Sequence, residues 1–149
     1  MRRLALVACL ALLTGACATA PRPSPARGAA FAAAAVAMVG RPYRYGGADP
    51  DGFDCSGLVS YAAAGIGLRV PRTAQELLGT GTAVERDSLA RGDLVFMHLS
   101  AKELHVGIAM DRTHFVHAPS QGGRVRIDSL DAPPYGRGFL AARRPDFPP

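Results

Sequence analysis

The spacing of apolar residues in the first half of the chain is typical of helices. Gly28–Val39 is rich in alanine and is followed by Gly40, which predicts a helix that ends at this glycine. A second helix is predicted over Cys55–Ala64, with Asp54 as its N-cap. Thr73–Glu76 has the pattern of a capping box and indicates the start of a third, short helix.

After Gly92 the apolar residues alternate with polar ones, as they do in strands. The predicted strands are Leu94–Leu99, His105–Met110, His114–Ala118, Arg124–Ile127 and Gly138–Arg143. Helices followed by antiparallel strands predict an α+β fold, with N-terminal helices packed on one face of a small antiparallel sheet. A chain of 149 residues suits one such domain.

The N-terminal segment has the pattern of a secretion signal. A basic start, Met1–Arg3, precedes an apolar run over Leu4–Leu13 that is too short to span a membrane. Small residues then lead to Cys17, which resembles the lipid-modified cysteine of bacterial lipoproteins, although Thr14 stands where leucine is usual. We therefore expect a lipoprotein signal peptide over residues 1–16 and lipidation at Cys17.

Two other positions in this segment are alternative processing sites to Cys17. Cys9 follows a sequence closer to the usual lipidation motif, but it leaves too short an apolar run before it. Cleavage after Ala20 would produce a secreted protein, yet Pro21 would follow the cut. Because Ala18 follows the cysteine, the resemblance to lipoproteins implies an outer-membrane protein that faces the periplasm.

Residues 17–27 are rich in proline, which predicts a non-helical tether between the lipid anchor and a domain over residues 28–149. The formal net charge is +5, but the arginines are scattered along the chain. This distribution argues against nucleic-acid binding and is compatible with an anionic cell-wall polymer as partner.

Cysteine usage points to one reactive side chain. If Cys17 is acylated, Cys55 is the only thiol left in the mature protein. Such a thiol is either an inert buried side chain or one that is kept for its reactivity. Cys55 would be the first residue of its helix, where backbone N–H groups and the helix dipole lower the pKa of a thiol below its ordinary value of about 8.5.

A histidine must accept the proton of such a nucleophile, and two of the four histidines lie on adjacent predicted strands. With a turn centred on Asp111, His105 faces His117 on a surface that also carries small residues. The side chain of His114 is expected on the other face of its strand. His98 lies on an earlier strand and has no such pairing. One imidazole can act as a base while the second orients it.

Paired histidines also occur in metal sites and as structural hydrogen-bonding groups. A metal site needs further ligands, and neither Cys-x-x-Cys nor His-Glu-x-x-His spacing occurs in the chain. We therefore expect no metal and no other cofactor.

Six short motifs in this order resemble those of the NlpC-like cysteine peptidase family. They are Pro42–Gly47, Asp54–Gly57, Val70–Thr73, Gly92–Val95, His105–Ile108 and Phe115–Ala118. The resemblance runs from about Ala29 to Arg143 and implies a papain-like fold with permuted topology. It also implies hydrolysis of peptidoglycan peptides.

Carried over by position, the resemblance makes Cys55 the nucleophile, His105 the general base and His117 its orienting partner. Tyr43 matches a family tyrosine that lines the site and helps to hold the oxyanion, together with the N–H of Cys55. The bond cut would be D-Glu–diaminopimelate within a stem, or a diaminopimelate-containing cross-link between stems. The expected partners are peptidoglycan and, through the anchor, a membrane, with the protein acting as a monomer.

Two other function classes stay open at this point. The first comprises other papain-like amidases and acyltransferases, which use the same thiol chemistry. The second is a non-catalytic binding module of the cell envelope, although such modules typically lack the cysteine or the first histidine, and both are present here.

Overall fold

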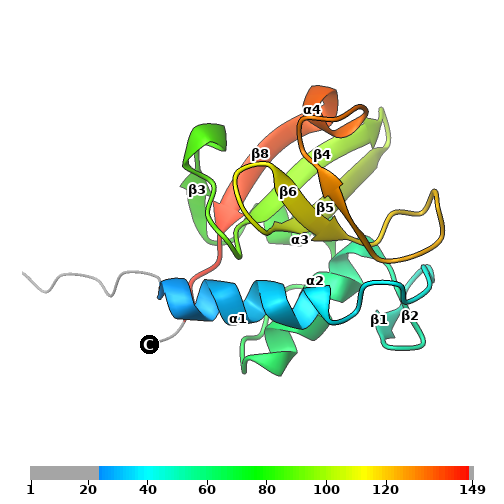
Figure 1. Ribbon diagram of the computed structural model, residues 1–149, viewed down its shortest axis with the longest axis horizontal. Coiled ribbons are helices and arrows are strands. Elements are labelled where there is room, and N and C mark those ends of the chain that lie inside the picture. Colours follow the sequence, from blue (N-terminus) through cyan, green and yellow to red (C-terminus); the bar gives the residue numbers. More distant parts are fainter. Residues whose placement is uncertain (1–23, 148–149) are drawn as a thin grey trace, which may run out of the picture.

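A computed structural model describes residues 24–147 of the chain. In this structure, helices lie on one side of an antiparallel sheet (Figure 1). The principal helices are α1 (Pro25–Val36), α2 (Cys55–Gly65) and α3 (Ala74–Leu78). The predicted signal peptide, Cys17 and the first part of the predicted tether lie outside the described residues.

The sheet has six strands in the order β3-β8-β4-β5-β6-β7, and every neighbouring pair is antiparallel. Its strands are β3 (Thr82–Val84), β4 (Leu94–Ser100), β5 (Glu103–Ala109), β6 (His114–His117), β7 (Arg126–Ser129) and β8 (Phe139–Arg144). The predicted α+β class is therefore confirmed, and the five predicted strands correspond to β4–β8 with ends shifted by one or two residues.

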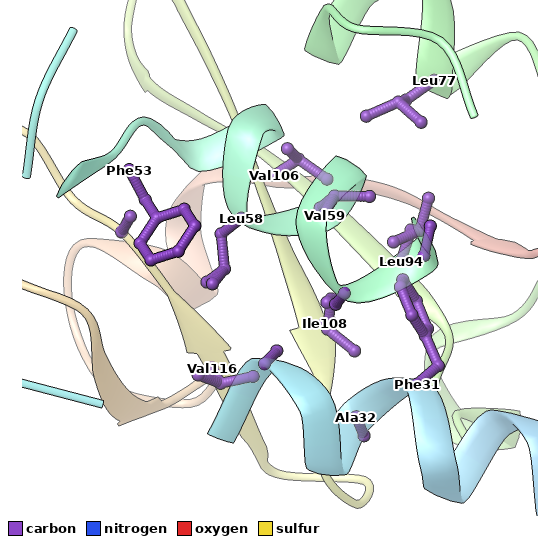
Figure 2. Packing of buried hydrophobic residues seen from close by; sticks show 14 of the residues in the cluster. Phe31, Ala32, Phe53, Leu58, Val59, Leu77, Leu94, Val106, Ile108 and Val116 are labelled. Carbon is purple, nitrogen blue, oxygen red and sulfur yellow. The ribbon is translucent and has the colours of Figure 1, made fainter. Parts of the chain in front are cut away.

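Alternation along the strands divides the buried side chains between the two faces of the sheet. Val106, Ile108 and Val116 face the helices and pack with residues such as Phe31 and Leu58 (Figure 2). A second cluster lies on the opposite face and includes Val95, Met97, Ala109, Phe115, Leu130 and Tyr135. Each large apolar side chain that is fully buried contributes about 1.5 to 3 kcal/mol, so the sheet is stabilised from both sides.

Helix α1 begins earlier than the sequence pattern predicted. It starts at Pro25, so residues 25–27 are helical, and the prediction of a non-helical tether is wrong for these three residues. Proline is well suited to the first helical position, since its φ is already helical and its missing N–H would have no partner there. The helix also ends at Val36, and turns connect it to Gly40, whose φ is +90°.

The predicted starts of the other two helices are confirmed. The side chain of Asp54 accepts a hydrogen bond from the N–H of Gly57 at 2.6 Å, which caps α2. Thr73 and Glu76 form the reciprocal capping box at the start of α3.

Several short elements were missed because they contain too few residues to show periodicity. The segment between Gly47 and Asp54 contains a small hairpin, with β1 (Ala48–Asp49) and β2 (Gly52–Phe53). Strand β3 pairs only with β8, at the edge of the sheet. Two single turns, η1 (Arg86–Ser88) and α4 (Tyr135–Gly138), complete the fold.

Candidate active site

Cys55 lies in a groove of about 630 Å³ at the start of α2. Tyr43 and Tyr45 line the groove from one loop, and Arg72 lines it from the segment before α3. Leu104, next to His105 on β5, also lines it. The groove therefore joins the start of α2 to the strand that carries the predicted base.

Three backbone N–H groups act on the sulfur of Cys55: those of Val106, Ser56 and Cys55 itself. Each of them favours the thiolate, as expected at the start of a helix. Burial has the larger effect, however, and raises the pKa of the Cys55 thiol above its ordinary value, with the charge of Asp54 adding to this. The expectation of a lowered thiol pKa is thus wrong for the unliganded protein, because it left out desolvation.

The effect of the Val106 N–H also indicates where the sulfur lies. Val106 follows His105 directly on β5, so the sulfur of Cys55 lies against the strand segment that carries this histidine. Strands β5 and β6 pair only through Ile108↔Val116 and Ala109↔Phe115. The paired part of this ladder therefore ends at Ile108, two residues from Val106.

Asp54 connects three segments around Cys55. Its carboxylate accepts hydrogen bonds from the N–H of Gly57 in α2 and, at 2.9 Å, from the N–H of Gly46 in the preceding loop. Arg72 donates to both of its oxygens, at 2.9 and 2.7 Å, and these bonds hold the pKa of Asp54 below its usual value despite partial burial. Asp54 is therefore a capping residue, as expected, and Arg72 fixes it in place.

Gly57 permits this arrangement because the first turn of α2 packs against the loop that contains Gly47. A Cβ built on Gly57 would lie 1.9 Å from the carbonyl oxygen of Gly47, which no side chain tolerates. The glycine of the Asp54–Gly57 motif is thus required by a backbone contact next to Cys55.

The hairpin that carries His105 and His117 has a different register from the predicted one. Its turn is centred on Arg112, so that Ile108 faces Val116, and His105 no longer faces His117 directly. The reason is local: the side chain of Asp111 accepts the N–H groups of both Thr113 and His114, which lengthens the turn. Because the register shifts by two residues, the two histidines still share one face of the sheet, as diagonal neighbours.

The two histidine rings form a hydrogen bond with each other in the interior of the protein. Nε2 of His105 and Nδ1 of His117 are 2.8 Å apart, and the side chains are only 2% and 0% exposed. Gly107 makes room for the pair, since a Cβ there would lie 3.1 Å from the Cβ of His117 and 2.5 Å from the ring of Phe115. The predicted association of His105 with His117 is therefore present in the structure.

Burial keeps both imidazoles neutral near pH 7. It lowers the pKa of His105 to about 3, with the proximity of His117 and Arg126 acting in the same direction. It lowers the pKa of His117 to about 4, although the carboxylate of Asp128 partly opposes this. A neutral imidazole is able to accept a proton, which a general base requires.

Three polar residues behind His117 were not found from the sequence. Oδ2 of Asp128 lies 2.9 Å from Nε2 of His117, and it also accepts hydrogen bonds from Arg126 and from the hydroxyl of Tyr135. The alternation of Arg126 and Asp128 along β7 shows that they share a face. Only the pairing of β6 with β7, with His117 opposite Arg126, shows that this face meets the histidines.

The other two histidines lie outside this arrangement, as expected. His98 is exposed on β4. His114 is exposed at the turn and is bonded to Asp111 and Thr113. Within residues 24–147, no group of three or more His, Cys, Asp or Glu side chains is arranged to hold a metal ion. No helix in this range is long and apolar enough to cross a membrane.

Tyr43 lies in the groove, as expected, and is half-buried. Burial raises the pKa of its hydroxyl, and the nearby Cys55 and Asp54 raise it further. The hydroxyl therefore stays protonated and is able to donate a hydrogen bond. Tyr45, by contrast, is 91% exposed at the edge of the groove.

The chain is similar in sequence to known proteins. Residues 40–144 match the sequence profile of the NlpC/P60 family. The chain is 40% identical over 113 residues to the murein DD-endopeptidase MepH of Escherichia coli, covering 72% of this chain and 42% of MepH. It is 39% identical over 108 residues to the probable endopeptidase NlpC of the same species, covering 70% of each chain.

The fold is also similar to solved structures. The NlpC/P60 domain of the peptidoglycan hydrolase SagA superimposes with a TM-score of 0.67 and 32% identity, over 78% of this chain and 97% of that one. The predicted papain-like fold is therefore confirmed. With a profile that covers most of the described residues and relatives near 40% identity, the chain belongs to the NlpC/P60 family.

Proposed function

We propose that this protein is a peptidoglycan endopeptidase that uses Cys55, His105 and His117 as its catalytic residues. One observation carries the proposal: a thiol surrounded by backbone N–H groups lies against the strand of a buried, neutral histidine pair. A purely structural cysteine would not need such donors at a groove open to substrate. The names of the relatives MepH and SagA support cell-wall peptides as the substrate class.

In this proposal His105 accepts the proton of Cys55 as the sulfur attacks the scissile carbonyl carbon. The carbonyl electron pair moves to oxygen, and its return expels the amine, which takes the proton from His105 and leaves a thioester. Water then attacks the thioester with His105 again as base, which releases the acid and restores the thiol. Because burial keeps both groups neutral at rest, the proton moves when substrate is attacked.

We infer that the oxyanion is held by the N–H of Cys55 and the hydroxyl of Tyr43. The N–H at the start of α2 has no acceptor one turn earlier in its helix, so it is available to a developing negative charge. Tyr43 lies in the same groove as Cys55 and remains protonated at neutral pH.

Digestion of purified muropeptides, with products identified by mass, tests the activity and the bond. A cut after D-Glu and a cut at a diaminopimelate cross-link give fragments of different mass. Cys55→Ala and Cys55→Ser should abolish cleavage and change the free energy of unfolding by less than about 1 kcal/mol. Full activity of the folded alanine variant would disprove the mechanism, whereas transfer of the acyl group from Cys55 to added hydroxylamine would support a thioester intermediate.

We also propose that the protein is anchored in the outer membrane through a lipid on Cys17 and acts there as a monomer. The support for the anchor is the signal-like segment before Cys17 and the proline-rich residues after it. Cys17→Ala should abolish lipid labelling and release the protein from membranes. Unchanged membrane fractionation of this variant would contradict the anchor. The oligomeric state is a separate question, which sedimentation velocity measures.

A further inference from the structure

Asp128 accepts three hydrogen bonds on one oxygen at the inner end of the histidine pair. Its Oδ2 lies 2.9 Å from Nε2 of His117, 2.7 Å from Nε of Arg126 and 2.8 Å from the hydroxyl of Tyr135. The side chain of His117 is fully buried, and that of Asp128 is 25% exposed. These contacts form a continuous row from Asp128 through His117 to His105.

The donors and acceptors in this row fix the position of every proton. A carboxylate only accepts, so Nε2 of His117 must carry hydrogen and Nδ1 of the neutral ring must be bare. Nδ1 of His117 therefore accepts, and Nε2 of His105, at 2.8 Å, must donate. Since His105 is also neutral, its Nδ1 has no hydrogen and remains the one basic nitrogen of the pair.

The negative charge of Asp128 is a smaller part of its effect. The guanidinium of Arg126 binds the same oxygen, so its positive charge partly offsets the charge of Asp128 at the histidines. The pKa of each histidine shows this opposition, because Arg126 lowers both while Asp128 raises that of His117. Among these three residues, Asp128 is the one that accepts the hydrogen of His117. Arg126 and Tyr135 only donate to Asp128.

We propose that Asp128 is a positioning residue that sets the tautomers of His117 and His105, so that Nδ1 of His105 is free to accept the proton of Cys55. This rests on the proposed function, since Asp128 acts through the two histidines and does not touch the reacting atoms. Arg126 and Tyr135 hold the acceptor oxygen in place.

Two substitutions separate the acceptor from its charge. Asp128→Ala removes the acceptor, so that Nε2 of His117 loses its partner and both tautomers become populated. Asp128→Asn removes the charge but keeps an acceptor, because Nε of Arg126 can only donate and orients the amide oxygen toward His117. Asp131→Asn is the matched control, since the carboxylate of Asp131 is exposed shortly after β7 and pairs with Arg86, outside the row.

The experiment measures kcat and KM on muropeptides and, independently, the ring tautomers by ¹H–¹⁵N NMR of histidine-labelled full-length chain. The parent should show Nε2–H in both buried histidines. Asp128→Ala should show mixed tautomers and a kcat lower by about 10²- to 10⁴-fold with little change in KM, as when a catalytic histidine takes the wrong tautomer. Asp128→Asn should keep the parent tautomers and lose less kcat than Asp128→Ala, because an acceptor for Nε2–H of His117 remains. Asp131→Asn should match the parent in both measurements.

The outcomes distinguish this inference from the proposed function. Parent tautomers and parent kcat in Asp128→Ala would overturn the role of Asp128 and leave the peptidase activity standing. An equal loss of kcat in Asp128→Asn and Asp128→Ala with unchanged tautomers would also overturn it, because charge would then be the cause. If the parent cleaves no muropeptide, the proposed function fails, and the NMR spectra still decide whether Asp128 sets the tautomers.

Discussion

Arg72 donates to both carboxylate oxygens of Asp54, the residue immediately before the proposed nucleophile. The same guanidinium donates to the hydroxyl of Ser56 at 2.8 Å and to the carbonyl of Gly47 at 3.3 Å. The pair is partly buried, with side chains 40% and 14% exposed. The segment before α3 therefore determines where the first turn of α2, and with it Cys55, is placed.

Arg72→Ala should lower both the stability and the hydrolysis rate. Asp54 would keep its backbone donors, so we expect a loss of about 1 to 2 kcal/mol in the free energy of unfolding, measured in urea. Arg72→Lys should fall in between, because an ammonium does not span both oxygens. Arg44→Ala is the control: its ion pair with Asp49 is half exposed at both side chains and should contribute less than about 0.5 kcal/mol. Equal effects of the two alanine variants would contradict a special role for Arg72.

The four histidines should differ in their effect on catalysis. His105→Ala should cost about as much activity as the loss of Cys55, since members of such a unit act non-additively. His117→Ala should cost less, and His117→Asn or Gln less still. His98→Ala and His114→Ala should keep near-normal rates, because both side chains are exposed away from the pair. A folded His114→Ala variant as inactive as His105→Ala would be incompatible with the observed register.

Alkylation of Cys55 against pH tests the protonation state of the resting site. Because burial raises the pKa of the thiol, the midpoint of its reaction with iodoacetamide should lie above the ordinary midpoint of a cysteine thiol. Mass spectrometry of the peptide that contains Cys55 separates it from the other cysteines. The same peptide alkylated in urea should show the ordinary midpoint. A midpoint well below that value in the folded protein would indicate a resting thiolate–imidazolium pair instead.

The buried histidines should make folding sensitive to acid. Their pKa values are depressed to about 3 and about 4 from 6.5, so below pH 6.5 the unfolded chain binds protons that the folded protein excludes. Stability is therefore fully present above pH 6.5 and falls as the pH is lowered, by up to about 1.4 kcal/mol per pH unit for each histidine. Urea unfolding between pH 7 and 4.5 measures this slope. The double variant His105→Gln/His117→Gln should flatten it, whereas His114→Gln should leave it unchanged.

The sequence by itself determined those features that depend on a few neighbouring residues. Asp54 caps α2 because an Asp side chain reaches the N–H three residues later, whatever surrounds it. His105 and His117 share a face because strands alternate with a period of two, and a register error of two residues does not change parity. The α+β class likewise follows from the sequence, because the helical spacing of apolar residues comes first along the chain and the alternation typical of strands comes after it.

The tertiary structure alone decided the features that depend on segments far apart in the chain. Arg72 meets Asp54 across 18 residues, and Asp128 meets His117 across 11, because strand pairing and helix packing bring these segments together. Desolvation reverses the expected direction of the pKa of Cys55, since burial depends on every segment around the groove. Local hydrogen bonding is encoded within one or two turns of chain, whereas burial and long-range contacts exist only once the whole core has packed.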